Sequence, residues 1–262
     1  MQKGQSMPKG QSMPKGLGMN KPKMILFDYG QTLVNESTFN GLIGETALLA
    51  RAVKNGSNAT AEEVLHFINE LEEEIGRFNP DTVDQYKFEI HNFNFQRYVY
   101  EYFNVSFDIN QWEMEKTFWD NASPAVPTDG INKLLEYLQD NQIRTGVISN
   151  ISFGEEALNR RINELIPTNH FEFILATSEY VFRKPSKHIF NLAIKRARLD
   201  AEDIWYCGDN PICDVEGSAG VGMTAIWYTG AARSKSRKPE AEHILIEDWK
   251  DMISLLQSNK FN

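Results

Sequence analysis

The sequence predicts an α/β protein that is built on a doubly wound parallel sheet and carries an all-helical domain inserted after its first strand. From residue 127 onward, short apolar runs of strand length alternate with amphipathic segments of about ten residues, as in parallel strands joined by helices. One more apolar run, Met24–Phe27, lies far upstream. The intervening residues 37–122 show helical periodicity and no convincing strand pattern, so we assign them to an insertion.

The boundaries follow from these patterns. Residues 1–22 contain a tandem repeat in which the sequence QSMPKG of residues 5–10 recurs at residues 11–16. We expect a disordered tail here, because so few apolar side chains cannot offset the entropy lost on ordering. Residues 23–36 and 123–262 are predicted to form the sheet domain, and residues 37–122 the helical domain.

Composition and charge exclude several classes of protein. The net charge of −9 argues against a nucleic-acid or anionic membrane surface, since phosphate groups attract Lys- and Arg-rich faces. No stretch approaches the roughly 18 apolar residues that span a bilayer. The two cysteines, Cys207 and Cys213, fit no disulfide framework, and no Cys/His spacing suggests zinc. We therefore expect a cytoplasmic protein with a small-molecule partner.

The insertion is expected to contain several helices. Leu42, Thr46 and Val53 fall on one helical face, and Thr60 is a suitable N-cap for a helix that starts at residue 61. A third helical region, 83–103, is unusually rich in Phe and Tyr. We interpret these aromatic side chains as the core of a helix bundle, with the alternative that a few of them line a substrate cleft.

The second half of the chain is predicted to alternate strands and helices. The strands are expected at 144–148, 171–176, 204–207, 224–228 and 243–246, and the helices at 130–139, 155–165, 186–197, 214–219 and 249–257.

Polar residues follow several of these predicted strands. Asp28 comes directly after Met24–Phe27. Further polar residues follow the later strands in the same way: Ser149, Asn150, Lys184, Asp209 and Asp214. Taken singly, each could be a turn residue, a helix cap or a solvated charge. Because the carboxyl ends of parallel strands meet at one edge of the sheet, we expect them to form one site.

In this order the residues resemble four motifs of the haloacid dehalogenase-like (HAD) superfamily. Asp28, Gly30 and Thr32 stand where family phosphatases have DxDxT/V, and Ser149 ends an apolar strand as in the second motif. Lys184 before Pro185 matches the third motif. The fourth is Gly208-Asp209 with Asp214 five residues further on. The resemblance implies a Rossmann-like core and a helical cap, formed by residues 37–122, that closes over the site.

The resemblance also implies roles for these residues. Asp28 would be the nucleophile that forms an aspartyl-phosphate, and Lys184 would stabilise the nucleophile and the phosphate. Thr32, Ser149 and Asn150 would bind the phosphoryl group. The cofactor would be Mg²⁺, bound by an Asp28 oxygen, the Gly30 carbonyl and a carboxylate of Asp209 or Asp214.

The sequence departs from the family pattern at Gly30, where phosphatases usually have a second aspartate as general acid and base. Three alternatives could account for the missing acid and base: a leaving group that needs little protonation, an acid supplied by the cap, or a different reaction. Tyr29 is not our candidate acid, because backbone alternation turns it away from Asp28. For a phosphonatase-like reaction the cap lysines are Lys54, Lys87 and Lys116, and none is distinguished by its context.

We therefore expect a Mg²⁺-dependent phosphatase that acts on a small phosphorylated metabolite. The alternatives are a phosphonatase-like or dehalogenase-like hydrolase with the same nucleophile, and a catalytically impaired binding or regulatory protein. Retention of Asp28, Lys184, Asp209 and Asp214 favours an enzyme, since binding alone needs no nucleophile.

Overall fold

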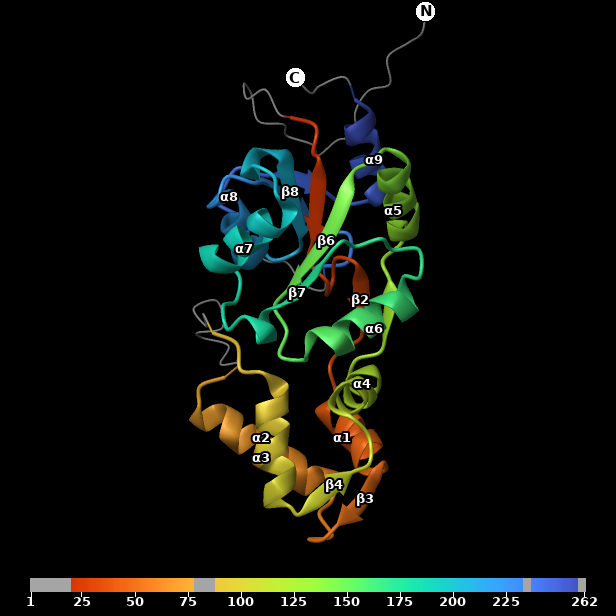
Figure 1. Ribbon diagram of the computed structural model, residues 1–262, viewed down its shortest axis with the longest axis vertical. Coiled ribbons are helices and arrows are strands. Elements are labelled where there is room, and N and C mark those ends of the chain that lie inside the picture. Colours follow the sequence, from red (N-terminus) through yellow and green to blue (C-terminus); the bar gives the residue numbers. More distant parts are fainter. Residues whose placement is uncertain (1–19, 78–87, 233–236, 259–262) are drawn as a thin grey trace, which may run out of the picture.

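A computed structural model describes residues 20–77, 88–232 and 237–258 of the chain. The predicted tail of residues 1–22 falls almost wholly outside these ranges. The described residues form a larger sheet domain and a smaller domain that are stacked along the long axis of the molecule (Figure 1). No helix in the described ranges is long and apolar enough to cross a membrane.

The larger domain contains a six-stranded sheet in the order β10-β9-β8-β1-β6-β7, and every neighbouring pair is parallel. The doubly wound parallel sheet predicted from the sequence is thereby confirmed. From the central strand β1 the chain builds one edge and then returns to build the other, so its direction switches between β1 and β8. The strands are β1 (Met24–Phe27), β6 (Arg144–Ser149), β7 (Ile174–Ala176), β8 (Ile204–Gly208), β9 (Thr224–Tyr228) and β10 (Ile244–Ile246).

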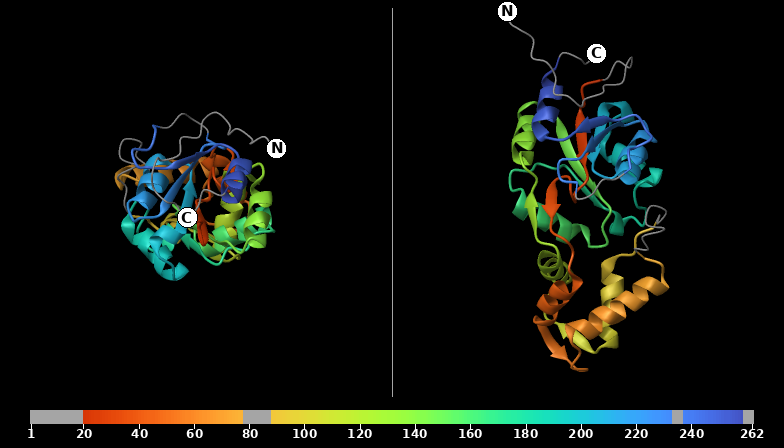
Figure 2. Two further views of the ribbon diagram at one scale, coloured as in Figure 1. Left: turned by 90° about the horizontal axis from the view of Figure 1, so that it is seen from above. Right: turned by 180° about the vertical axis from the view of Figure 1, so that it is seen from behind.

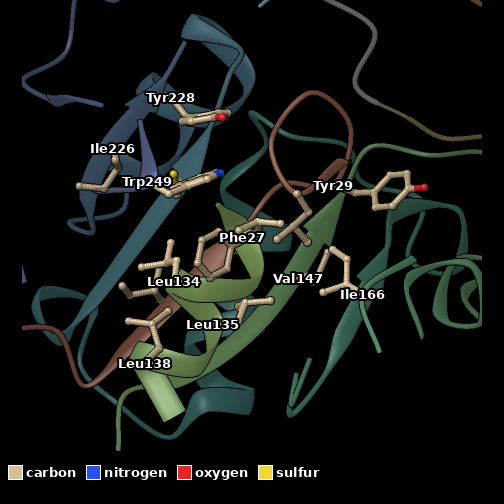
Figure 3. Packing of buried hydrophobic residues seen from close by; sticks show 14 of the residues in the cluster. Phe27, Tyr29, Leu134, Leu135, Leu138, Val147, Ile166, Ile226, Tyr228 and Trp249 are labelled. Carbon is tan, nitrogen blue, oxygen red and sulfur yellow. The ribbon is translucent and has the colours of Figure 1, made fainter. Parts of the chain in front are cut away.

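Helices cover both faces of the sheet, as Figure 2 shows in the end-on view. Alternate residues of β1 enter different cores: Ile25 and Phe27 pack with α5, α6 and α9, whereas Met24 and Leu26 pack with α7. Figure 3 shows the first of these cores, with Phe27 beside Leu134, Leu135 and Trp249. The helices of this domain are α5 (Ile131–Asp140), α6 (Glu155–Leu165), α7 (Lys187–Ala197), α8 (Gly217–Ala219) and α9 (Trp249–Gln257).

The smaller domain, the cap, has its own core around Leu48, Val64 and Val99. It is mostly helical, but the prediction of an all-helical cap is wrong: β3 and β4 form an antiparallel pair. Val53, expected on a helix, lies in β3, because α1 ends earlier. Strands of three and four residues are too short to show a period-two pattern. The elements are α1 (Gly41–Leu49), β3 (Ala52–Asn55), α2 (Ala61–Glu74), α3 (Asn92–Tyr102), β4 (Val105–Phe107) and α4 (Gln111–Ala122).

The aromatic segment is only partly described, because residues 78–87 lie outside the described ranges. Within α3, Tyr100 is buried in the cap core, whereas Tyr98 and Tyr102 are exposed and stack around Phe67. The interpretation as helix core therefore holds for one face of α3. Thr60 caps α2 as expected, since its side chain accepts a hydrogen bond from the backbone N–H of Glu63.

A covalent connection and several noncovalent contacts join the cap to the core. The covalent one is a pair of short antiparallel strands, β2 (Val34–Glu36) and β5 (Ala125–Pro127). On the other side of the cap, the residues that precede α3 contact loops of the core. The Glu89 backbone N–H donates to the Val181 carbonyl over 2.6 Å, and that of Asn92 donates to Ser152 over 2.8 Å.

A buried carboxylate in the cap makes its stability depend on pH. Glu45 of α1 is 1% exposed, and its carboxylate accepts a hydrogen bond from the Tyr100 hydroxyl. Burial raises the pKa of Glu45 to about 7. The free energy of unfolding should therefore fall as the pH rises from the ordinary glutamate pKa to about 7, because ionisation then favours the unfolded chain.

We expect Glu45→Gln to raise the free energy of unfolding by about 1–3 kcal/mol at pH 8 and by much less at pH 4.5. Urea unfolding of both proteins at the two pH values measures this, with the exposed Glu136→Gln as the control. An equal difference at both pH values would contradict the assignment of a buried, ionisable Glu45.

Candidate active site

The centre of the site is a lysine held between two carboxylates. Lys184 Nζ lies 2.6 Å from Asp28 Oδ1 and 2.6 Å from Asp214 Oδ1. It also donates to the Tyr206 hydroxyl over 2.7 Å, and this hydroxyl donates in turn to the Ile148 carbonyl. Lys184 is only 2% exposed, so the ammonium group makes all of these contacts inside the protein.

The two strands at the switch point supply the carboxylates. Asp28 directly follows β1, and its backbone N–H donates to the Cys207 carbonyl of β8, which continues the sheet. Asp214 lies in the π-helical turn Pro211–Glu216 after β8. Its Oδ2 accepts the backbone N–H of Asn210 over 2.9 Å.

Gly208 allows this close approach. A Cβ at position 208 would lie 2.3 Å from Asp214 Cγ, so any side chain there would displace the carboxylate. Steric exclusion of any side chain therefore explains why the fourth motif has glycine at position 208.

The other predicted residues surround this centre. Asn150 does not point its side chain into open space: it donates to the Lys184 carbonyl and accepts from the Lys184 backbone N–H, at 2.9 and 2.8 Å. It thus fixes the backbone of the lysine. Ser149 is buried at the end of β6. The Thr32 hydroxyl is buried without a hydrogen-bond partner among the described residues. That these three residues bind a phosphoryl group stays a prediction.

Burial dominates the electrostatics of the site. It raises the pKa of Asp28 to about 6, although the Lys184 ammonium group acts in the opposite direction. Burial and the nearby carboxylates of Asp214 and Asp28 raise the pKa of Asp209 to about 8. For Lys184, burial alone would lower the pKa, but Asp214 and Asp28 raise it above its ordinary value. The lysine therefore stays charged, while the carboxylates repel one another.

These residues fit a divalent cation. One carboxylate oxygen from each of Asp28, Asp209 and Asp214 lies within 4.8 Å of the other two. Carboxylate oxygens are the ligands that Mg²⁺ prefers, and a dication would relieve the repulsion that raises the pKa of Asp209. The Gly30 carbonyl stays a predicted ligand.

A cavity of about 320 Å³ lies between the cap and the core, and Asn150 is the predicted site residue that lines it. The core contributes Asn150, Ser152 and Arg183 to its wall, next to the motif residues, and the cap contributes mainly apolar side chains. The apolar and aromatic members of this wall are Phe39, Leu65, Ile68, Phe95, Val99, Tyr100, Phe118, Trp119, Ile151 and Phe153. In α3, Phe95 and Tyr100 belong to the cap core and also line the cavity, and that this cavity is a substrate cleft stays a prediction.

Glu89 of the cap reaches into the core beside the site. Its side chain is fully buried, and it accepts hydrogen bonds from Arg183 and from the Thr177 hydroxyl. Arg183 directly precedes Lys184, so this contact joins the cap to the loop that carries the lysine. Glu89 could not be identified from the sequence, because its partners are about 90 residues away.

Two of the cap lysines considered for a phosphonatase-like reaction are engaged elsewhere. Lys116 pairs with Asp120 and Glu164, and Lys54 donates to Asn104 within the cap. Lys87 lies outside the described residues. Tyr29 is directed to Arg161, whose Nε donates to its hydroxyl over 2.7 Å, in agreement with its exclusion as the acid.

A parallel sheet, an inserted cap and a carboxylate cluster at the switch point are the features of a capped α/β enzyme. Residues 25–228 match the sequence profile of the family described as haloacid dehalogenase-like hydrolase. This match covers most of the chain, so the protein belongs to that family, and the resemblance seen in the four motifs is confirmed.

Similar sequences include hydrolase-domain proteins and a phosphatase. Haloacid dehalogenase-like hydrolase domain-containing protein 3 of Homo sapiens is 29% identical over 118 residues, which are 44% of this chain and 46% of that protein. The chain thus matches only about half the length of this relative and of its Mus musculus counterpart. The glyceraldehyde 3-phosphate phosphatase of Pyrococcus abyssi is 23% identical over 211 residues, 79% of this chain and 81% of that protein.

Solved structures share the fold. A 2-haloacid dehalogenase from Pseudomonas syringae pv. Tomato has a TM-score of 0.59 and 22% identity, with 90% of this chain and 98% of that chain covered. A HAD phosphatase from Thermococcus onnurineus has a TM-score of 0.51 and 16% identity, with 90% and 99% covered. The same fold therefore carries at least two kinds of hydrolytic chemistry.

Proposed function

We propose that the protein is a Mg²⁺-dependent phosphatase that acts on a small phosphorylated metabolite through an aspartyl-phosphate on Asp28. The observation that carries this proposal is the cluster of Asp28, Asp209 and Asp214, whose oxygens lie within 4.8 Å of one another around a buried lysine. Such a cluster suits a cation that neutralises phosphoryl oxygens.

Different residues carry out different parts of the proposed reaction. The Asp28 carboxylate attacks phosphorus, and the bond from phosphorus to the leaving oxygen breaks. Lys184, held by Asp28, Asp214 and Tyr206, supplies a fixed positive charge beside the attacking oxygen. Ser149 ends β6 and Asn150 follows it at the same edge of the sheet, where the Ser149 hydroxyl and the Asn150 backbone would bind phosphoryl oxygens.

Mg²⁺, when bound, would shield the repulsion between the nucleophile and the phosphate. Of the two carboxylates after β8, Asp209 is the better direct ligand. Both oxygens of Asp214 are already hydrogen-bonded, to Lys184 and to the Asn210 backbone. Burial, together with the carboxylates of Asp214 and Asp28, raises the pKa of Asp209, and a bound cation would offset both effects.

The competing hydrolase chemistries have less support. A dehalogenase with the same nucleophile has no need of three clustered carboxylates. A phosphonatase-like Schiff base lacks a candidate among the described cap lysines, since Lys54 and Lys116 are engaged elsewhere. A binding protein would not need a nucleophile next to a buried lysine.

We expect phosphate release that depends on Mg²⁺ and stops when the metal is chelated. The panel should contain an acyl phosphate, an aryl phosphate and several sugar phosphates, each with and without Mg²⁺. Release from none of them, together with halide release from a 2-haloacid, would replace this proposal with the dehalogenase alternative.

A further inference from the structure

The structure shows what fills the space where family phosphatases have their second aspartate. A Cβ built on Gly30 would lie 3.3 Å from Glu36 Oε2. We propose that Glu36 supplies the carboxylate that position 30 lacks and acts as the proton acceptor in hydrolysis of the aspartyl-phosphate. This inference rests on the proposed phosphatase function.

The local fold brings Glu36 back to the site. After Asp28 the chain turns tightly, with the Leu33 backbone N–H donating to the Tyr29 carbonyl, and Gln31 adopts a left-handed conformation. Val34 then forms a bridge with Gly30. Glu36 lies at the end of β2, two residues beyond this bridge, so its side chain can reach the position that a residue 30 side chain would occupy.

Core and cap together orient the carboxylate. Glu36 Oε1 accepts the indole N–H of Trp119 over 2.9 Å and lies 3.5 Å from the Arg161 guanidinium. The other carboxylate oxygen, Oε2, lies beside Gly30. Arg161 is itself fixed, because it donates to the Tyr29 hydroxyl and to Asp120 and stacks over Trp119. A carboxylate held by an N–H group and balanced by a guanidinium is pre-organised to act on a defined proton.

Glu36 also lines the cavity between the cap and the core. It lines the 320 Å³ cavity together with Asn150, Ser152 and Arg183, which belong to the loops that carry the site. Its side chain is 19% exposed, so water can reach it. The same carboxylate therefore borders both the catalytic loop and the cavity.

The proposed step is the second half of the reaction. The oxygen of a water molecule forms a bond to phosphorus, and the proton of that water moves to Glu36. The bond between phosphorus and the Asp28 oxygen breaks, which restores the Asp28 carboxylate and releases inorganic phosphate. The protonated Glu36 then gives its proton to the leaving oxygen of the next alkyl substrate or to solvent.

The experiment is a time course with p-nitrophenyl phosphate and Mg²⁺, because its leaving group departs without an acid. We expect Glu36→Gln to release about one p-nitrophenolate per chain rapidly and then to turn over about 10²–10³-fold more slowly than wild type. Mass spectrometry of the quenched protein should show one added phosphoryl group. Glu136→Gln is the matched control, because it makes the same change from acid to amide at an exposed glutamate of α5.

A double variant that moves the carboxylate from position 36 to position 30 provides a second measurement. We expect Glu36→Ala combined with Gly30→Asp to regain at least about tenfold in steady-state rate over Glu36→Ala alone, since general acid–base catalysis is worth about 10²–10⁴-fold. The proposal is overturned if Glu36→Gln turns over as fast as Glu136→Gln, or if it is slow without accumulating phosphoprotein. If wild type releases phosphate from no substrate, the proposed function itself fails, which is a different outcome.

Discussion

Asp28→Asn is expected to abolish turnover and to leave the fold intact. Asparagine has the volume of aspartate and keeps one oxygen that can accept the hydrogen bond from Lys184, but its amide does not attack phosphorus. The buried Asp214 remains as a partner for Lys184. Because burial already raises the pKa of Asp28 to about 6, removing this charge should cost little stability.

Steady-state phosphate release and thermal unfolding, measured in parallel, check this expectation. We expect no release above the rate without enzyme, and a circular dichroism spectrum like that of wild type. The exposed Asp129→Asn serves as a control for the change from acid to amide in the same domain. Substantial turnover by a folded Asp28→Asn protein would show that another residue is the nucleophile, and the proposed mechanism would have to be abandoned.

Much of the core could be predicted because its signals are local. Each strand of the sheet is a short apolar run, and helices of clear periodicity separate most of the runs. Since parallel strands end at one edge, the residues after them had to be neighbours, whatever the details of packing. This is why Asp28, Lys184 and Asp214 are found together, although they are far apart in the sequence.

The parts that escaped prediction depend on contacts between distant segments. The strand pairs β2/β5 and β3/β4 are too short for a periodic pattern. Tyr206 reads as one more apolar residue of a buried strand, but its hydroxyl holds Lys184. Glu36 could not be identified, because its orientation depends on Trp119, which is 83 residues away, and on Arg161. The missing carboxylate at position 30 can be recognised from the sequence. The proposed replacement, Glu36, can be recognised only from the three-dimensional structure.

The buried lysine should control both activity and stability. Lys184→Met keeps an unbranched side chain of similar length but leaves the carboxylates of Asp28 and Asp214 facing each other without a cation. Breaking a buried ion pair from one side typically costs about 3–5 kcal/mol, and losing one preorganised charge at a reacting centre about 10²–10³-fold in rate. We expect losses of these sizes at pH 8, the stability being measured without Mg²⁺.

Lys187→Met is the matched control, because Lys187 is exposed at the start of α7, three residues further on. Urea unfolding should separate the two variants, and added Mg²⁺ should restore part of the lost stability if the carboxylates bind it. The stability difference from wild type should shrink as the pH falls from 8 toward about 6, because Lys184 lowers the pKa of Asp28 and its loss lets Asp28 take up a proton at a higher pH than in wild type, which removes the repulsion in the variant. If Lys184→Met unfolded at the same urea concentration as Lys187→Met at pH 8, the two carboxylates would not depend on this ammonium group, and its role in keeping the nucleophile ionised would fall with it.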